Sequence, residues 1–153
     1  MDTEIIRRFN ERVRPEDQVF FLGDFMLRGG REGGVNKKDF YLNQLLCKNI
    51  VFIRGNHDRG SNLKTLIQSL VIKYAGNYIY LVHDPQYANS IYPINLVGHV
   101  HQHWKFKRLA TAMSSTTLIN VSVDVWDFYP VALDEIMRQY YWWSKHGKEL
   151  LKE

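Results

Sequence analysis

Short apolar segments that end in glycine, histidine or an oxygen-bearing residue restrict what this chain can fold into. Four such ends follow one another along the sequence: Gly23–Asp24, Gly55–Asn56–His57–Asp58, His83 and Gly98–His99. In α/β sheets the carboxyl ends of strands lie beside loops that converge on one crevice, and ligands bind there. Glycine lets the backbone turn tightly beside such a crevice. The sequence therefore predicts an α/β fold with these side chains gathered at one edge.

The remaining hydrophobic pattern is typical of a single α/β domain over residues 1–153. Apolar residues at helical spacing predict helices over 3–13, near 40–46 and from 133 to 143, and Ser61 could cap a further helix that extends to about residue 70. Short β-prone runs predict strands over 18–22, 49–53, 71–74, 78–83, 94–99 and 115–125. Residues 27–34 are rich in glycine and predict a loop. Helices that alternate with strands indicate an α/β class.

Length and composition exclude several classes of protein. Apolar residues make up 45% of the chain and charged residues 24%, which is close to the globular average, so disorder is not indicated. No apolar run approaches the roughly 20 residues of a membrane helix, and the first residues lack the apolar core of a signal peptide. A disulfide framework needs more than the single Cys47. We therefore expect a cytoplasmic protein that does not contact a membrane.

The net charge of +4 leaves two interpretations open. The chain is either an ordinary basic soluble protein or one that attracts an anionic substrate such as a phosphate ester. Its lysines and arginines are scattered without a dense run, so a dedicated nucleic-acid tail is not indicated. Nucleic acid is expected only as a substrate.

The stretch "LVGHVHQH" (96–103) places three histidines at alternate positions. Residues two apart in an extended chain point the same way, so His99 and His101 can face one crevice. Solvated histidines at a polar strand end are the alternative. Aspartate, asparagine and histidine together form a mixed oxygen and nitrogen set that suits Mn, Fe, Zn or Co rather than Mg or Ca alone. The order "GNHD", strand-end histidine and "GHxH" favours a metal site over coincidence.

With these motifs the chain resembles the calcineurin-like metallophosphoesterases. Its glycine–aspartate, "GNHD", histidine and "GHVH" motifs stand in the order of that family, and residues 120–136 are similar to the tail of its small bacterial and archaeal members. The resemblance covers essentially the whole chain. It implies two stacked β-sheets flanked by helices, an αββα four-layer sandwich, and hydrolysis of phosphomonoesters or phosphodiesters.

The resemblance also implies a role for each motif residue. Asp24 would bridge two metal ions, and His101 would bind the second of them. His57 would not bind metal but would donate a proton to the leaving group. The remaining ligands of the first ion would be Asn56, His83 and His99. We expect Mn first, with Fe, Zn, Co or Ni as alternatives.

Other polar residues near these motifs are assigned less closely. Arg54 and Arg59 flank "GNHD" and would grip a phosphate group in a bidentate manner, or they are solvated loop arginines. Asp58 would contact a metal, orient the neighbouring histidine or cap the turn. His103 and His146 are placed outside the site.

One family motif is not found in this sequence. The family begins with a strand that ends in Asp-x-His, and none of the six histidines here has an aspartate two residues before it. Either the start is misassigned, the chain is trimmed, or half of the metal centre is lost. The second site would keep Asp24 and His101, fewer than the three protein ligands of catalytic zinc sites, so we expect it to be empty or weakly filled.

The same departure has consequences for assembly and function. Without that strand, segment 18–22 would present an unpaired edge that recruits a second chain, and the aromatic "YYWW" stretch (140–143) would be a second adhesive surface. We therefore expect a homodimer. The alternative to a phosphoesterase is a binding or scaffold module on the same fold, with weak or absent chemistry.

Overall fold

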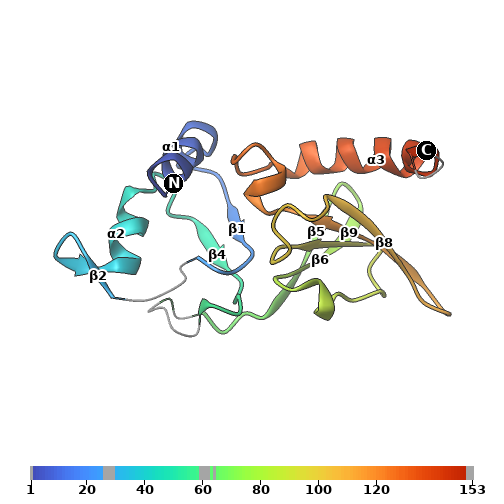
Figure 1. Ribbon diagram of the computed structural model, residues 1–153, viewed down its shortest axis with the longest axis horizontal. Coiled ribbons are helices and arrows are strands. Elements are labelled where there is room, and N and C mark those ends of the chain that lie inside the picture. The colour runs from blue at the N-terminus through green and yellow to red at the C-terminus, as the bar shows by residue number, and fades with distance from the viewer. Residues whose placement is uncertain (1, 26–29, 59–62, 64, 151–153) are drawn as a thin grey trace.

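The computed structural model describes residues 2–25, 30–58, 63 and 65–150 of the chain (Figure 1). The helices are α1 (Asp2–Arg12), α2 (Lys37–Gln44) and α3 (Leu133–Leu150), with short 3-10 helices η2 (Pro85–Tyr87) and η3 (Val123–Val125). The strands are β1 (Val19–Phe21), β2 (Arg31–Glu32), β3 (Val35–Asn36), β4 (Ile50–Phe52), β5 (Ser69–Tyr74), β6 (Asn77–Val82), β7 (Ile94–Val97), β8 (Phe106–Ala110) and β9 (Ser115–Asn120).

Parallel strand pairing determines where the strand ends lie. The larger sheet has the strand order β5-β6-β7-β9-β8. Its three central strands, β6, β7 and β9, are parallel to one another. Val82 pairs with Val97, so the residues that follow β6 and β7 leave the sheet at the same edge. β1 and β4 form a two-stranded parallel sheet, here called the smaller sheet, with Phe21 opposite Phe52, and β2 and β3 form a separate antiparallel pair. The loops after β1 and β4 are likewise neighbours.

The main core lies on one face of the five-stranded sheet. Alternate residues of its central strands, such as Leu81 and Leu96, join a cluster that also contains Ile53 at the end of β4. Met137 of α3 is buried in the same cluster, and α3 lies along this sheet in Figure 1. α1 and α2 cover the smaller sheet through a second cluster around Phe9. Within the described residues, no helix is both long enough and apolar enough to cross a membrane.

The expected α/β fold, with stacked sheets flanked by helices, is confirmed, but some element boundaries are not. The expected helix from 61 to about 70 is wrong in its described part, because β5 begins at Ser69 and Thr65 Oγ1 donates to the Phe52 carbonyl at 2.6 Å. The expected strand over 115–125 ends at Asn120 and is followed by η3. The sequence pattern missed β8, an edge strand whose residues are partly or fully exposed.

Replacement of Met137 by alanine tests the contribution of the α3 contact to stability. Met137 is 4% exposed, and removal of a buried methionine side chain typically costs about 2–5 kcal/mol. We expect the free energy of unfolding in urea to fall by that amount. Met113→Ala is the matched control, because Met113 is 95% exposed and should change stability by less than about 0.5 kcal/mol. Equal effects of the two substitutions would contradict this packing.

Candidate metal centre

The loops that follow β1, β4, β6 and β7 meet at one edge of the two sheets, as the strand-end pattern predicts. The backbone N–H of His57 donates to Asp24 Oδ1 at 2.8 Å, which joins the β4 loop to the β1 loop. The N–H of Gly98 donates to the carbonyl of His83 at 2.9 Å, which joins the β7 loop to the β6 loop. The contacts connect residues that are far apart in the sequence.

Acceptor atoms from these loops converge on one point. His83 Nε2 lies 3.1 Å from Asp24 Oδ2. One terminal atom of the Asn56 amide lies 2.9 Å from each of these atoms and 3.3 Å from His99 Nδ1. Ligand atoms held about 2.1 Å from one metal ion lie roughly 3.0–3.4 Å from each other. The separations therefore match those of ligands around a single cation, and Asp24, His83 and His99 form a metal-compatible group.

The ring of His83 presents the correct nitrogen to this point. Its Nδ1 lies 2.7 Å from the carbonyl oxygen of Leu22. A carbonyl can only accept, so Nδ1 carries the hydrogen and Nε2 of the neutral ring presents a lone pair. That lone pair faces the carboxylate of Asp24, which is also an acceptor. A cation between the two atoms would satisfy both of them.

The Asn56 amide gives a second indication of a cation. The position of its inward atom is surrounded by acceptors from Asp24, His83 and His99, whereas its other terminal atom lies 3.3 Å from His57 Nε2. Without a cation the NH₂ group is favoured at the inward position. With a cation the oxygen is favoured there, as a ligand. The mixed nitrogen and oxygen set is one that transition-metal ions accept.

Glycine is required where the loop after β1 contacts the loop after β4. A Cβ at Gly23, whose φ is +91°, would lie 2.6 Å from Gly55 Cα and 2.6 Å from His83 Nδ1. A Cβ at Gly55 would lie 2.2 Å from Asp24 Oδ1. No side chain fits at either position without displacing Asp24, His83 or the backbone of the facing loop. The tight turns expected from these glycines are confirmed.

The ligand-type residues themselves adopt an uncommon backbone conformation. Asp24, His99 and His101 have φ angles of 55°, 66° and 47°, in the left-handed region that non-glycine residues seldom occupy. Such conformations cost free energy and persist where the surrounding contacts impose them, often at functional sites. The loops are therefore held in shape by their neighbours.

Asp58 is one of the groups that hold the loops together. It is 3% exposed. Its Oδ2 accepts from the N–H groups of Asp24 at 2.9 Å and Gly55 at 2.8 Å, and its Oδ1 accepts from the N–H of Phe25 at 3.0 Å. Of the roles that the sequence left open, these contacts support a structural one. The carboxylate joins the β1 loop to the β4 loop beneath the acceptor cluster.

His101 is placed differently from the other expected ligands. Its side chain is 70% exposed, and Nδ1 lies 3.4 Å from Asp124 Oδ2. The metal-compatible group found among the described residues does not include it. Its carbonyl accepts from Asn120 Nδ2 at 2.6 Å, and the same Nδ2 donates to the carbonyl of Trp104 at 2.8 Å. Asn120 thus anchors the loop that carries His101. The sequence analysis did not identify this role, although a polar residue at the end of the otherwise apolar strand β9 could have indicated it.

The far end of this loop is anchored through Lys105. Its Nζ lies 3.7 Å from the centre of the Trp126 ring, a cation–π contact. Burial lowers the pKa of the Lys105 ammonium group below its usual value. The indole N–H of Trp126 donates in turn to the carbonyl of Asn120 at 2.8 Å. Lys105 therefore packs against Trp126 and helps to hold this end of the loop in place.

The remaining sequence-predicted residues lie around the cluster or outside the described part. His57 is exposed, and Arg54 is partly buried with its backbone N–H bonded to the carbonyl of Ile67 at 2.8 Å. Arg59 lies outside the described residues. His146 is stacked on Trp142 within α3, at 4.7 Å between ring centres.

Replacement of His83 by alanine tests the cluster directly. The variant loses a buried imidazole whose tautomer is set by Leu22 and which belongs to the metal-compatible group, so we expect most divalent metal taken up by the protein to be lost. Metal analysis of the purified protein by mass spectrometry measures the stoichiometry. His103→Ala removes an exposed histidine and should leave the stoichiometry unchanged. Full metal content in His83→Ala would contradict the assignment.

Asp58→Asn tests the tie between the loops. The substitution places an NH₂ group against at least one backbone N–H donor, so we expect unfolding free energy to fall on the order of 2–4 kcal/mol. Urea unfolding in a chelator separates this loss from metal binding. Asp39→Asn, at a carboxyl that is 52% exposed, is the control and should have little effect. If Asp58→Asn is as stable as Asp39→Asn, the proposed structural role of Asp58 is wrong.

Comparisons with known proteins identify the family and support the fold. A sequence profile of the calcineurin-like phosphoesterase family matches residues 3–152. An uncharacterized protein of Methanocaldococcus jannaschii is 36% identical over 143 residues, which cover 90% of this chain and 74% of that protein. A protein of unknown function from Aquifex aeolicus has a similar fold, with a TM-score of 0.59, 23% identity, and coverage of 90% of this chain and 84% of that one. The chain belongs to the calcineurin-like phosphoesterase family.

Proposed function

We propose that this protein is a metal-dependent hydrolase of phosphate esters. The observation that supports this function most directly is the convergence of acceptor atoms from Asp24, His83 and His99, together with the Asn56 amide, at separations typical of metal ligands. The family to which the chain belongs provides independent support. Substrates would be phosphomonoesters or phosphodiesters.

The proposed centre holds two divalent ions. Asp24, Asn56, His83 and His99 would hold the first, while Asp24 and His101 would contribute to the second. When bound, the ions would polarise a phosphoryl oxygen and lower the pKa of a water molecule. We propose Mn first, with Fe, Zn, Co or Ni as alternatives that the same mixed nitrogen and oxygen ligands accept.

His57 would act as the general acid. Its backbone N–H is held by Asp24 Oδ1 at 2.8 Å, so the residue is fixed beside the cluster. Its ring is exposed, with Nε2 3.3 Å from the Asn56 amide. Imidazole is a side chain that exchanges a proton near neutral pH. The proposed step is transfer of that proton to the leaving-group oxygen.

Positive charge around the site would attract the substrate. Arg54 is proposed to contact the phosphate group, and Arg59 is proposed for the same role from the sequence alone. The net charge of +4 favours an anionic ligand of this kind, with nucleic acid entering only as a substrate. We place the reaction in the cytoplasm, on the basis of the composition and the single cysteine, Cys47.

A binding or scaffold module is the second candidate. It is favoured by the position of His101, whose side chain is 70% exposed. In the part of the chain that the structure describes, the metal-compatible group contains Asp24, His83 and His99 but not this histidine. A centre with one complete shell would bind a cation and catalyse little.

His57→Ala distinguishes the two candidates. Loss of a general acid typically lowers the rate 10²–10⁴-fold, whereas metal content should be unchanged because His57 is not a ligand in the proposed centre. Turnover of a phosphodiester and a phosphomonoester in Mn²⁺ measures the rate, and metal analysis measures the content. A substrate whose leaving group needs no proton should lose much less rate.

The control for this experiment is His103→Ala, which should match the unmodified protein in both measurements. Absence of turnover in the unmodified protein at full metal content would favour the binding module. Parallel loss of metal and activity in His57→Ala would contradict the role of His57 as an acid.

A further inference from the structure

α3 has a solvent-facing side with an acidic residue in its first turn and basic residues farther along the helix. Its buried side, which includes Ile136 and Met137, packs on the five-stranded sheet. A solvent-facing side carries four exposed residues spaced by four, three and four positions, a spacing that aligns them along one side of a helix. These residues, here named the α3 stripe, are Asp134, Arg138, Tyr141 and Lys145. The third of them, Tyr141, accepts a hydrogen bond from Asn77 Nδ2 of β6 through its hydroxyl at 3.4 Å, so this side borders the sheet at that point.

The charged residues of the α3 stripe have no partner within the described part of the chain. Neither an ion pair nor a hydrogen bond involves the side chains of Asp134, Arg138 or Lys145 there. Neighbouring charges behave differently, since Glu135 lies 3.8 Å from Arg12. The stripe therefore presents an unpaired negative charge toward the start of α3 and unpaired positive charges farther along it.

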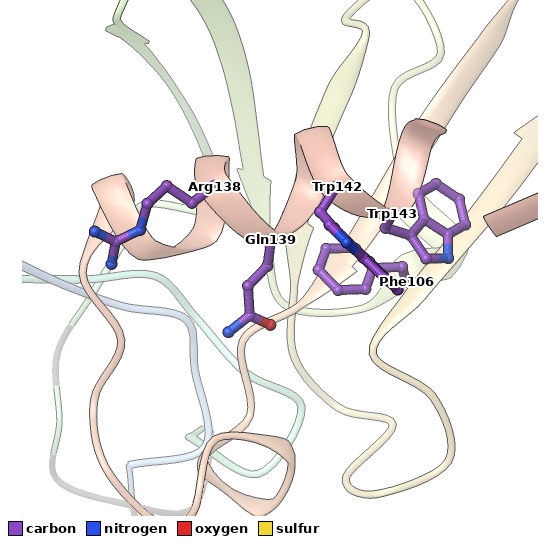
Figure 2. A pocket seen from close by; sticks show the side chains of 5 residues that line it. All are labelled: Phe106, Arg138, Gln139, Trp142 and Trp143. Carbon is purple, nitrogen blue, oxygen red and sulfur yellow. The ribbon is translucent and has the colours of Figure 1, made fainter. Parts of the chain in front are cut away.

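An apolar groove adjoins the α3 stripe. Trp142 is 56% exposed and Tyr141 48% exposed. Trp142 and Trp143 of α3 line a cavity of about 380 Å³ together with Phe106 of β8, and Arg138 of the stripe lines it as well (Figure 2). An exposed tryptophan at the mouth of an apolar groove is typical of an interaction surface.

The order of the α3 stripe is self-complementary. Asp134 and Lys145 are roughly 16 Å apart along the helix, at 1.5 Å per residue. If a second α3 packs antiparallel about a twofold axis between residues 139 and 140, Asp134 of each copy faces Lys145 of the other. Arg138 then faces Tyr141, a cation–π pair. Each contact occurs twice, as a twofold interface requires.

We propose that the α3 stripe binds a second copy of this chain, with the two α3 helices antiparallel. Helices in such contacts lie 8–10 Å apart. Arg138 belongs both to this contact and to the lining of the groove, so the second helix runs beside the groove. A parallel arrangement would instead bring each charge against its own kind, so charge complementarity selects the antiparallel one. The homodimer thus has a defined surface, separate from the metal centre.

A charge swap tests this interface. We expect sedimentation equilibrium to give twice the 18.1 kDa mass of one chain for the unmodified protein. Asp134→Lys and Lys145→Asp each create two like-charge pairs and should weaken the dimer by roughly tenfold or more. The double variant Asp134→Lys/Lys145→Asp restores opposite charges at both places and should restore the dimer. Circular dichroism of every variant confirms that it is folded.

Glu16→Lys is the matched control, since it reverses an exposed charge outside α3 and should leave the dimer unchanged. The proposal is overturned if the unmodified protein is a monomer. It is also overturned if Asp134→Lys leaves a folded dimer of unchanged affinity, or if the folded double variant is no stronger a dimer than the single variants.

Discussion

Three backbone N–H groups from two separate loops converge on the buried carboxylate of Asp58. The two strands that lead into these loops pair over only three residues each, which is too short to hold the loops in register by themselves. The carboxylate supplies the missing connection, because hydrogen bonds to a charged acceptor are stronger than neutral ones. Asp24 and Asn56 reach the same point because Asp58 holds the backbone beneath them.

That arrangement brings two acceptor atoms, His83 Nε2 and Asp24 Oδ2, to 3.1 Å from each other, where they repel unless an N–H donor or a cation lies between them. Gly23 and Gly55 permit the approach, and the left-handed backbone of Asp24 and His99 is part of its cost. A bound cation would relieve this repulsion. Because the unfolded chain cannot offer the same ligands together, metal binding and folding should be coupled.

The parts of the fold that the sequence predicted well are those whose residues are consistently buried. α3 shows helical periodicity because its apolar residues face the core, whereas the central strands β7 and β9 are buried on both faces and form continuous runs of buried residues. β8 was missed because it is an edge strand, where Lys107 and Arg108 are exposed and the apolar alternation is weak. Residues 61–70 were assigned to a helix because Ser61 is a possible N-cap, but Leu70 packs into the core from a strand.

The sequence by itself determined which residue types follow each strand, and strand-end chemistry was sufficient to indicate a metal centre. Tertiary structure alone decided how those residues meet. The tautomer of His83 depends on a carbonyl 61 positions earlier in the chain, and the role of Asp58 depends on N–H groups 33 and 34 positions away. The separation of His101 from the ligand group depends likewise on loop contacts with Asn120 and Asp124. The local sequence pattern predicts a helix or strand because burial of that element places apolar residues within it. The contacts named here join distant segments, so they produce no regular spacing of residue types in the sequence.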